Sequence, residues 1–164
     1  MKTLTIVRHG KSDWSNYELA DYDRPLKARG FNDAYQMALR FRESGSLPQI
    51  FITSPANRAL YTSIIFSRVL FNDFDNIKIN DDLYLASPRT ILTTVREISN
   101  SYDHIAVFGH NPGVTSFAND FVSEYIDNIP TSGFVRLDFD TSDWNLIKAD
   151  TLKNYVFDYP KRLT

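Results

Sequence analysis

Two of the three histidines in this 164-residue chain each follow a short apolar run and are flanked by glycine. Arg8, His9 and Gly10 come directly after the run 4–7, and His110 comes shortly after the run 105–108. Apolar runs of this kind are typical of strands buried on both faces, and open α/β sheets bind ligands at the carboxyl ends of their strands. Either histidine alone fits an ordinary loop position. The pair, with an arginine beside one of them, indicates a functional site.

A second arginine follows a third apolar run. The run consists of Ile50, Phe51 and Ile52 and ends in Thr53; Arg58 comes five residues after Thr53, in what we expect to be the first turn of a helix. A cation at that position opposes the helix dipole and is best tolerated where an anion is bound, although a solvated surface arginine is the simple alternative. If the three strands are neighbours, Arg58 joins Arg8 and the two histidines at one edge of the sheet. Two guanidinium groups suit a tetrahedral oxyanion such as phosphate.

The imidazoles have distinct roles if a phosphoryl group is held at this edge. A neutral ring is the natural nucleophile, because an ordinary histidine pKa near 6.5 leaves it largely unprotonated at cellular pH. We assign that role to His9, since Gly10 allows a backbone carbonyl to approach the ring and set its tautomer. We expect His110 to donate to the phosphoryl oxygens as an imidazolium. A metal site is rejected, because the motifs lack a close carboxylate or third imidazole and their arginines would repel a metal ion.

Composition narrows the remaining classes of function. The formal net charge of −2 and the pI of about 5.9 give no general attraction to nucleic acid or to an anionic membrane. The absence of cysteine excludes disulfides and thiolate chemistry and fits a reducing compartment. No apolar run approaches the length of a membrane span, and the first strand leaves no room for a secretory signal. We therefore expect a cytoplasmic protein that contacts neither nucleic acid nor membrane.

The elements that must position these residues alternate along the chain. Strands are predicted at 3–8, 49–53, 77–79, 105–108, 134–139 and 145–149, and helices at 29–43, 57–70, 89–99 and 114–121. This order predicts a single domain over residues 1–164, in the α/β class, with a mostly parallel central sheet in a three-layer α/β/α sandwich. The last two strands are expected to form a hairpin around residues 141–143. The aromatic tail from Thr151 is expected to pack against the domain at a position that the pattern does not specify.

These motifs resemble those of the histidine phosphatase superfamily, which contains the phosphoglycerate-mutase-like enzymes. The matching segments are Arg8-His9-Gly10, Arg24-Pro25-Leu26 with Gly30 and Ala34, Ser54-Pro55 with Arg58-Ala59 and Thr62, and Gly109-His110-Asn111-Pro112-Gly113. Lys11-Ser12-Asp13-Trp14, Asp23-Arg24-Pro25-Leu26, Leu83-Tyr84 and the short length further resemble the compact SixA-type phosphohistidine phosphatases. The resemblance implies a phosphoglycerate-mutase-like fold, a phosphorylated intermediate on His9, and no cofactor. It gives catalytic roles to His9, Arg8, Arg58 and His110.

Two departures from the mutase pattern bear on the substrate. Mutase-like members carry a glutamate as general acid two residues after a leucine in the loop that follows the third strand, and counting from Leu83 that position holds Leu85. Asp82 is the nearest carboxylate. Ser15 stands where mutases have a phosphate-contacting asparagine. Because an imidazole leaves phosphorus more readily than an alkoxide does, the missing acid favours hydrolysis of a protein phosphohistidine.

The residues leave other assignments open. We expect Arg8, Gly10, Arg58, His110 and Arg24 to bind the substrate, with Arg24 at the rim, although a salt bridge from Arg24 to a neighbouring aspartate is an alternative. One alternative function is a general phosphomonoesterase for small metabolites, with Asp82 as acid. Another is a module that binds phosphorylated partners without turnover. The partner is accordingly a phosphorylated protein or a small phosphorylated substrate.

Overall fold

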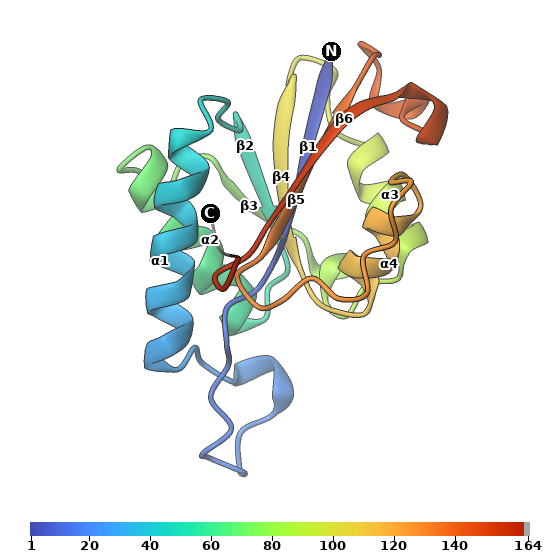
Figure 1. Cartoon of the computed structure of the whole chain (residues 1–164). Helices are drawn as coiled ribbons and strands as arrows, with labels where there is room; N and C mark the ends of the chain where they lie inside the picture. The colour runs from blue at the N-terminus through green and yellow to red at the C-terminus, as the bar shows by residue number, and fades with distance from the viewer. Residues whose placement is uncertain (163–164) are drawn as a thin grey trace.

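The computed structural model describes residues 1–162, which are built around one six-stranded sheet in the order β3-β2-β4-β1-β5-β6 (Figure 1). The strands are β1 (Lys2–Arg8), β2 (Ile50–Thr53), β3 (Ile77–Ile79), β4 (His104–Gly109), β5 (Phe134–Phe139) and β6 (Leu152–Asp158). The first four strands are parallel to one another, whereas β5 pairs antiparallel with β1 and β6 pairs antiparallel with β5. The predicted mostly parallel sheet is confirmed.

Helices cover both faces of the sheet. They are α1 (Ala28–Glu43), α2 (Asn57–Leu70), α3 (Pro88–Arg96) and α4 (Gly113–Asn119), and Figure 1 shows α1 and α2 on one side and α3 and α4 on the other. Alternate residues of β4 face opposite sides of the sheet. Ala106 and Phe108 pack with the α1 and α2 side chains, whereas Ile105 and Val107 pack with those of α3 and α4. Burial on both faces explains the continuous apolar runs in the sequence. The three-layer α/β/α prediction is confirmed.

Two glycines allow loops to approach helix starts closely. A Cβ atom on Gly113 would lie 1.9 Å from the carbonyl oxygen of Ala86, so α4 begins directly against the loop that follows β3. A Cβ atom on Gly30 would lie 2.3 Å from the carbonyl oxygen of Lys11, so the loop that leaves β1 rests on the first turn of α1. Any side chain at either position would push these segments apart. Both contacts lie at the carboxyl-end side of the sheet.

The predicted strand at 145–149 is wrong; the last two strands do pair antiparallel as expected, but they are β5 and β6, joined by residues 140–151 rather than by a tight turn at 141–143. Residues 144–146 and 149–151 form two short 3-10 turns, η3 and η4, and the last strand is β6, which belongs to the aromatic tail. The indole of Trp144 is fully buried and donates from Nε1 to the carbonyl of Tyr102 at 3.1 Å. This anchoring holds the segment away from β5, so the strand that pairs with β5 starts only at Leu152.

Among residues 1–162 no helix is long and apolar enough to cross a membrane.

Candidate active site

The carboxyl ends of β1, β2 and β4 meet at one edge of the sheet. Arg8 lies in register with Gly109, and Thr53 lies in register with Phe108. The residues that directly follow these strands therefore lie side by side, and the rings of His9 and His110 have centroids 5.1 Å apart. The structure thus brings together the two histidine loops that the sequence places a hundred residues apart.

His9 is held as a neutral ring with a free lone pair on Nε2. Its side chain is buried, and Nδ1 lies 2.7 Å from the carbonyl oxygen of Gly10. A carbonyl only accepts, so the hydrogen sits on Nδ1, and Nε2 accepts from Nε of Arg58 at 3.3 Å. Burial lowers the pKa of His9 to about 4, and the charges of Arg58 and Arg8 act in the same direction, outweighing the bond to Gly10. At neutral pH the ring is therefore neutral, and its Nε2 faces the guanidinium of Arg58.

Arg58 is fixed by a carboxylate that sequence reasoning did not assign to the site. Its Nη1 donates to the backbone carbonyl of Asp21 at 2.6 Å, and its Nη2 donates to Oδ2 of Asp21 at 2.9 Å. The hydroxyl of Tyr84 donates to the same oxygen at 2.8 Å. Desolvation would raise the pKa of Asp21, but the hydrogen bonds from Tyr84 and Arg58 outweigh it and hold that pKa below its usual value. Asp21 is therefore ionised at neutral pH.

Arg8 is oriented by a segment far along the chain. Its Nη1 donates to the carbonyl of Ile129 at 2.8 Å and to Oδ1 of Asn128 at 3.3 Å. Asn111, next to His110, donates to the same Oδ1 of Asn128 at 2.8 Å. Nε of Arg8 is buried without a hydrogen-bond partner in the described chain. Arg8 is thus held through Nη1, while its Nε remains a buried donor without a partner in the described residues.

His110 is paired with Ser54, a second residue that the sequence interpretation left without a role. Nε2 of His110 lies 2.7 Å from Oγ of Ser54, and the amide of Ala56 donates to the same oxygen at 3.3 Å. Within residues 1–162 the Ser54 hydroxyl hydrogen has no other acceptor, so it points to Nε2 and the ring hydrogen lies on Nδ1. Nδ1 is buried and unpartnered. It is a donor awaiting an acceptor.

The protonation state of His110 differs from the expected imidazolium. Burial, followed by the charges of His9 and Arg58, lowers the pKa of His110 to about 3. The free protein therefore holds a neutral ring at this position, because a positive charge would be desolvated beside two arginines. A neutral ring with hydrogen on Nδ1 can still donate to an oxyanion, so the expected donor function does not require the charge.

Gly10 has a positioning role in this structure. Its amide donates to Oγ1 of Thr62 at 2.9 Å, and its carbonyl accepts from His9, so both of its polar groups are engaged inside the protein. A Cβ atom here would lie 2.9 Å from the carbonyl oxygen of Gly30. Gly10 was expected to contact substrate, but the geometry instead makes it the residue that seats the His9 ring.

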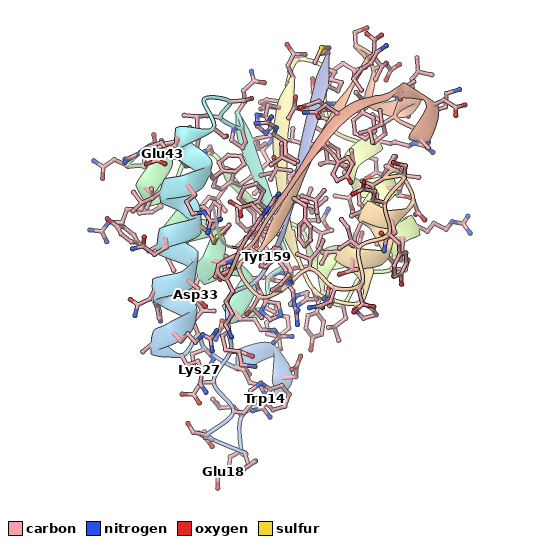
Figure 2. All side chains as sticks on the ribbon, in the orientation of Figure 1. Trp14, Glu18, Lys27, Asp33, Glu43 and Tyr159 are labelled. Atoms are coloured by element: carbon pink, nitrogen blue, oxygen red, sulfur yellow. The ribbon has the colours of Figure 1, made fainter. Side chains whose placement is uncertain are left out.

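Arg24 lies at the edge of the site, in the loop between β1 and α1. Its guanidinium carbon lies 3.8 Å from the centroid of the Trp14 ring, and Nε lies 4.0 Å from Oδ1 of Asp21. Figure 2 shows Trp14 and Glu18 on the loop that projects beyond the carboxyl ends of the strands. The expected salt-bridge alternative is present only as this long contact.

The candidate general acid is not tied to the site. Asp82 is exposed on the 3-10 turn η2 (Asp81–Leu83), and its carboxylate forms no hydrogen bond or ion pair with any described residue. Leu85 occupies the position of the mutase-like glutamate, and its apolar side chain is exposed. His104 lies at the other end of β4. In the described part of the chain no three His, Cys, Asp or Glu side chains are grouped to hold a metal ion.

Comparison with known proteins agrees with this geometry. The family profile described as Histidine phosphatase superfamily (branch 1) matches residues 4–83, which include His9, Arg24 and Arg58. The first half of the chain is therefore similar in sequence to the histidine phosphatase superfamily. An uncharacterized chloroplast protein of Arabidopsis thaliana is 38% identical over 61 residues, a stretch that covers 37% of this chain and only 28% of the plant protein.

Solved structures of the superfamily share the fold. A structure described as the phosphohistidine phosphatase SixA of Agrobacterium tumefaciens is 26% identical, with a TM-score of 0.77 over 85% of this chain and 92% of that one. A SixA structure of Nakamurella multipartita is 20% identical, with a TM-score of 0.79 over 98% and 97%. The protein histidine phosphatase SixA complexed with tungstate is 18% identical, with a TM-score of 0.75 over 96% and 94%. The latter two show the phosphoglycerate-mutase-like fold. The family-profile match and the likeness to SixA structures support a phosphatase function.

Proposed function

We propose that this protein is a phosphatase that takes a phosphoryl group onto Nε2 of His9 and hydrolyses the resulting phosphohistidine with water, and that its substrate is a protein phosphohistidine. The observation that carries the proposal is the state of His9. Its hydrogen is placed on Nδ1 by the Gly10 carbonyl, and its bare Nε2 faces Nε of Arg58. A nucleophile and a cationic donor thus face the same small volume.

The first step transfers the phosphoryl group. Nε2 of His9 attacks phosphorus while the bond from phosphorus to the substrate nitrogen breaks, and the substrate imidazole leaves with the electron pair and takes up a proton from water. Nε of Arg8 and Nδ1 of His110 are buried donors without partners in residues 1–162, and Nε of Arg58 points at the reacting nitrogen. Pre-positioned donors of this kind stabilise charge on the transferring phosphoryl oxygens, which is the main catalytic contribution expected for this reaction.

The second step restores the enzyme. The oxygen of a water molecule attacks phosphorus on the opposite side, the bond to Nε2 of His9 breaks, and orthophosphate is released with the protons of the water shared between product and solvent. The low pKa of His9, about 4, means that the ring leaves as a neutral imidazole and is ready for another cycle. The same donors serve both steps.

Among residues 1–162 no protonated carboxyl group is positioned at the site, which supports a phosphorus–nitrogen substrate. Asp21 is the carboxylate that contacts the site, and its bonds to Arg58 and Tyr84 keep it ionised. An alkoxide leaving group needs a proton from a positioned acid, whereas a phosphorylated imidazole can depart without one. The exposed position of Asp82 gives no support to the general phosphomonoesterase alternative.

The test compares three substrates: a phosphohistidine peptide, an aryl phosphate and an alkyl phosphate. We expect the peptide to have the highest kcat/KM, the aryl phosphate to react slowly and the alkyl phosphate to be nearly inert. Acid quenching during turnover should trap acid-labile phosphate on His9. Comparable turnover of the alkyl phosphate would contradict the substrate assignment, and binding without turnover of any of the three would instead identify a phosphate-binding module.

A further inference from the structure

Arg24 is a buried cation without a hydrogen bond. The residue is 8% exposed, and its Nε and Nη1 atoms are both buried and unpartnered in the described chain. Burying a charge without compensating bonds is costly, so an unpaired guanidinium at such a position calls for a specific reason. Near the two histidine loops, Nε of Arg8, Nδ1 of His110 and Oγ of Ser132 are likewise buried without partners among residues 1–162. Arg24 shares with them the property of a donor that awaits an acceptor.

The loop around Arg24 is built to hold it in place. The arms of the loop are joined by a bridge between Ser12 and Leu26 and by the amide of Asp13 donating to the carbonyl of Pro25 at 2.7 Å. The indole of Trp14 donates to Oγ of Ser12 at 3.1 Å, which fixes the ring over the guanidinium. A guanidinium stacked in this way is confined to one plane and can bind only ligands that approach its edge.

Asp21 does not satisfy Arg24. Oδ2 of Asp21 is already engaged by Arg58 and Tyr84, and Oδ1 lies 4.0 Å from Nε of Arg24, beyond hydrogen-bond distance. The carboxylate therefore lies between the two arginines and serves mainly Arg58. Arg58 and Arg24 thus face different oxygens of the same carboxylate. This arrangement favours a ligand of Arg24 that is distinct from the group that reacts at Arg58.

We propose that Arg24, beneath Trp14, binds a second anionic group of the substrate: a carboxylate side chain adjacent in sequence to the phosphohistidine of a phosphorylated protein. This inference rests on the proposed function and adds a preference for acidic sequence context. The planar edge of a stacked guanidinium matches the two oxygens of a carboxylate. The loop also presents exposed Trp14 and Tyr17 beside this position, as a surface for the rest of the partner chain.

The experiment uses two phosphohistidine peptides that differ only in a Glu or a Gln next to the phosphohistidine, together with phosphoramidate as a minimal substrate. The wild type should prefer the Glu peptide by about tenfold in kcat/KM, expressed in KM rather than kcat, as expected for one charge-assisted pair. Arg24→Gln should abolish the preference, bringing the ratio of the two kcat/KM values to about one, and should reduce phosphoramidate turnover less than turnover of the Glu peptide, because phosphoramidate lacks the second group. Arg24→Lys, which keeps the charge but not the planar fork, should retain part of the preference.

Arg29→Gln is the matched control. It removes the same charge as Arg24→Gln, but from an exposed side chain on α1 that pairs with Asp33. Arg29→Gln should leave kcat/KM unchanged for all three substrates. The melting temperatures of all variants establish that they are folded. Equal kcat/KM for both peptides in the wild type would overturn the inference. An equal loss on phosphoramidate and peptides in Arg24→Gln would also overturn it, because it would make Arg24 a support for Asp21 and Arg58. Failure of the wild type on all three substrates would instead refute the proposed function itself.

Discussion

The two ends of β4 carry one histidine each, and they differ in how their ring nitrogens are used. His104, at the start of the strand, is bonded on both sides, to Oγ1 of Thr5 and to Oγ of Ser46, each at 3.0 Å. His110, just past the end, is bonded only through Nε2. Both rings are buried, and burial lowers both pKa values, to about 4 and about 3. Burial and a shifted pKa therefore do not distinguish the two sites, whereas an unused donor does.

The same contrast extends across the sheet. At the amino ends of the strands, the fully buried Lys2 ammonium donates to the carbonyls of Asn100 and Tyr102 and to Oδ1 of Asp103, at 2.7, 2.8 and 2.9 Å. At the carboxyl ends, Arg8 and Arg24 keep buried donors without partners within residues 1–162. Lys2 satisfies its charge internally, although Nε of Arg136, opposite Thr5, also lacks a partner among residues 1–162. Arg8 and Arg24 differ from Lys2 in keeping unused donors near the two histidine loops.

Replacing the nucleophile should have the largest effect. In His9→Ala we expect phosphohistidine hydrolysis to fall by about 10⁴-fold or more, because no other group can take the phosphoryl transfer through a covalent intermediate. The acid-labile phosphate should disappear from quenched reactions, while the melting temperature stays close to that of the wild type. Retained turnover in a folded His9→Ala protein would refute the covalent mechanism.

Removing the Ser54 hydroxyl tests whether it sets the state of His110. In Ser54→Ala, Nε2 of His110 loses its donor, so the ring is free to move its hydrogen from Nδ1 to Nε2. We expect kcat to fall by about tenfold, as for the loss of one transition-state donor with partial compensation. ¹⁵N NMR of the ring should show hydrogen on Nδ1 in the wild type and a mixed tautomer in the variant. An unchanged tautomer would remove Ser54 from the mechanism, and Ser54→Thr should restore the wild-type signal.

Acid should destabilise the protein through its buried histidines. The folded-state pKa values of His9 and His104 are about 4, below the usual 6.5, so the unfolded chain binds more protons between these values. Stability is therefore full above about pH 6.5 and declines towards pH 4, by up to about 1.4 kcal/mol per pH unit for each such histidine. Denaturant titrations at several pH values measure the slope, and ¹H NMR titration of the rings assigns it. A ring that titrates near 6.5 would contradict the assigned burial effect.

The smallest effect on activity should come from the satisfied end of the sheet. His104→Gln should leave kcat/KM within about twofold, because His104 lies at the opposite end of β4 from the reacting groups. It should lower the free energy of unfolding at pH 7 by about 1–2 kcal/mol through the loss of buried hydrogen bonds. It should also reduce the pH dependence of that free energy below about pH 6.5 by the contribution of one histidine. A large loss of activity in this variant would break the distinction between the two ends.

The sequence predicted the strand ends well because the apolar runs end where burial ends. β1, β4 and α2 lie within about two residues of their predicted limits, and this placement alone brings His9, Arg58 and His110 together. Ser54 was quoted among the family motifs but had no role, because only its distance to His110 reveals the pairing. Asp21 was read as a neighbour of Arg24, since its bond to Arg58 depends on how a loop folds back.

Other features left no local signal. Asn128 and Ile129 hold Arg8 from 120 residues away, and nothing in their own sequence marks them as site residues. The last strand was placed too early because residues 145–149 have strand-like composition, whereas buried Trp144 anchors that stretch to the neighbouring turn. Both cases depend on tertiary contacts, which local patterns do not encode.

The loop between β1 and α1 has a base that is bonded to the rest of the protein and a tip that is not. Its base is fastened, since the amide of Lys27 donates to the carbonyl of Lys11 at 3.0 Å and Asn57 donates to the carbonyl of Asp23 at 2.9 Å. Its tip, residues 15–19, forms side-chain hydrogen bonds only to its own neighbours. Insertions or exchanges at the tip can therefore alter the exposed surface beside the site without moving His9 or Arg58. The loop thus combines a fixed base with a tip whose sequence is free to vary.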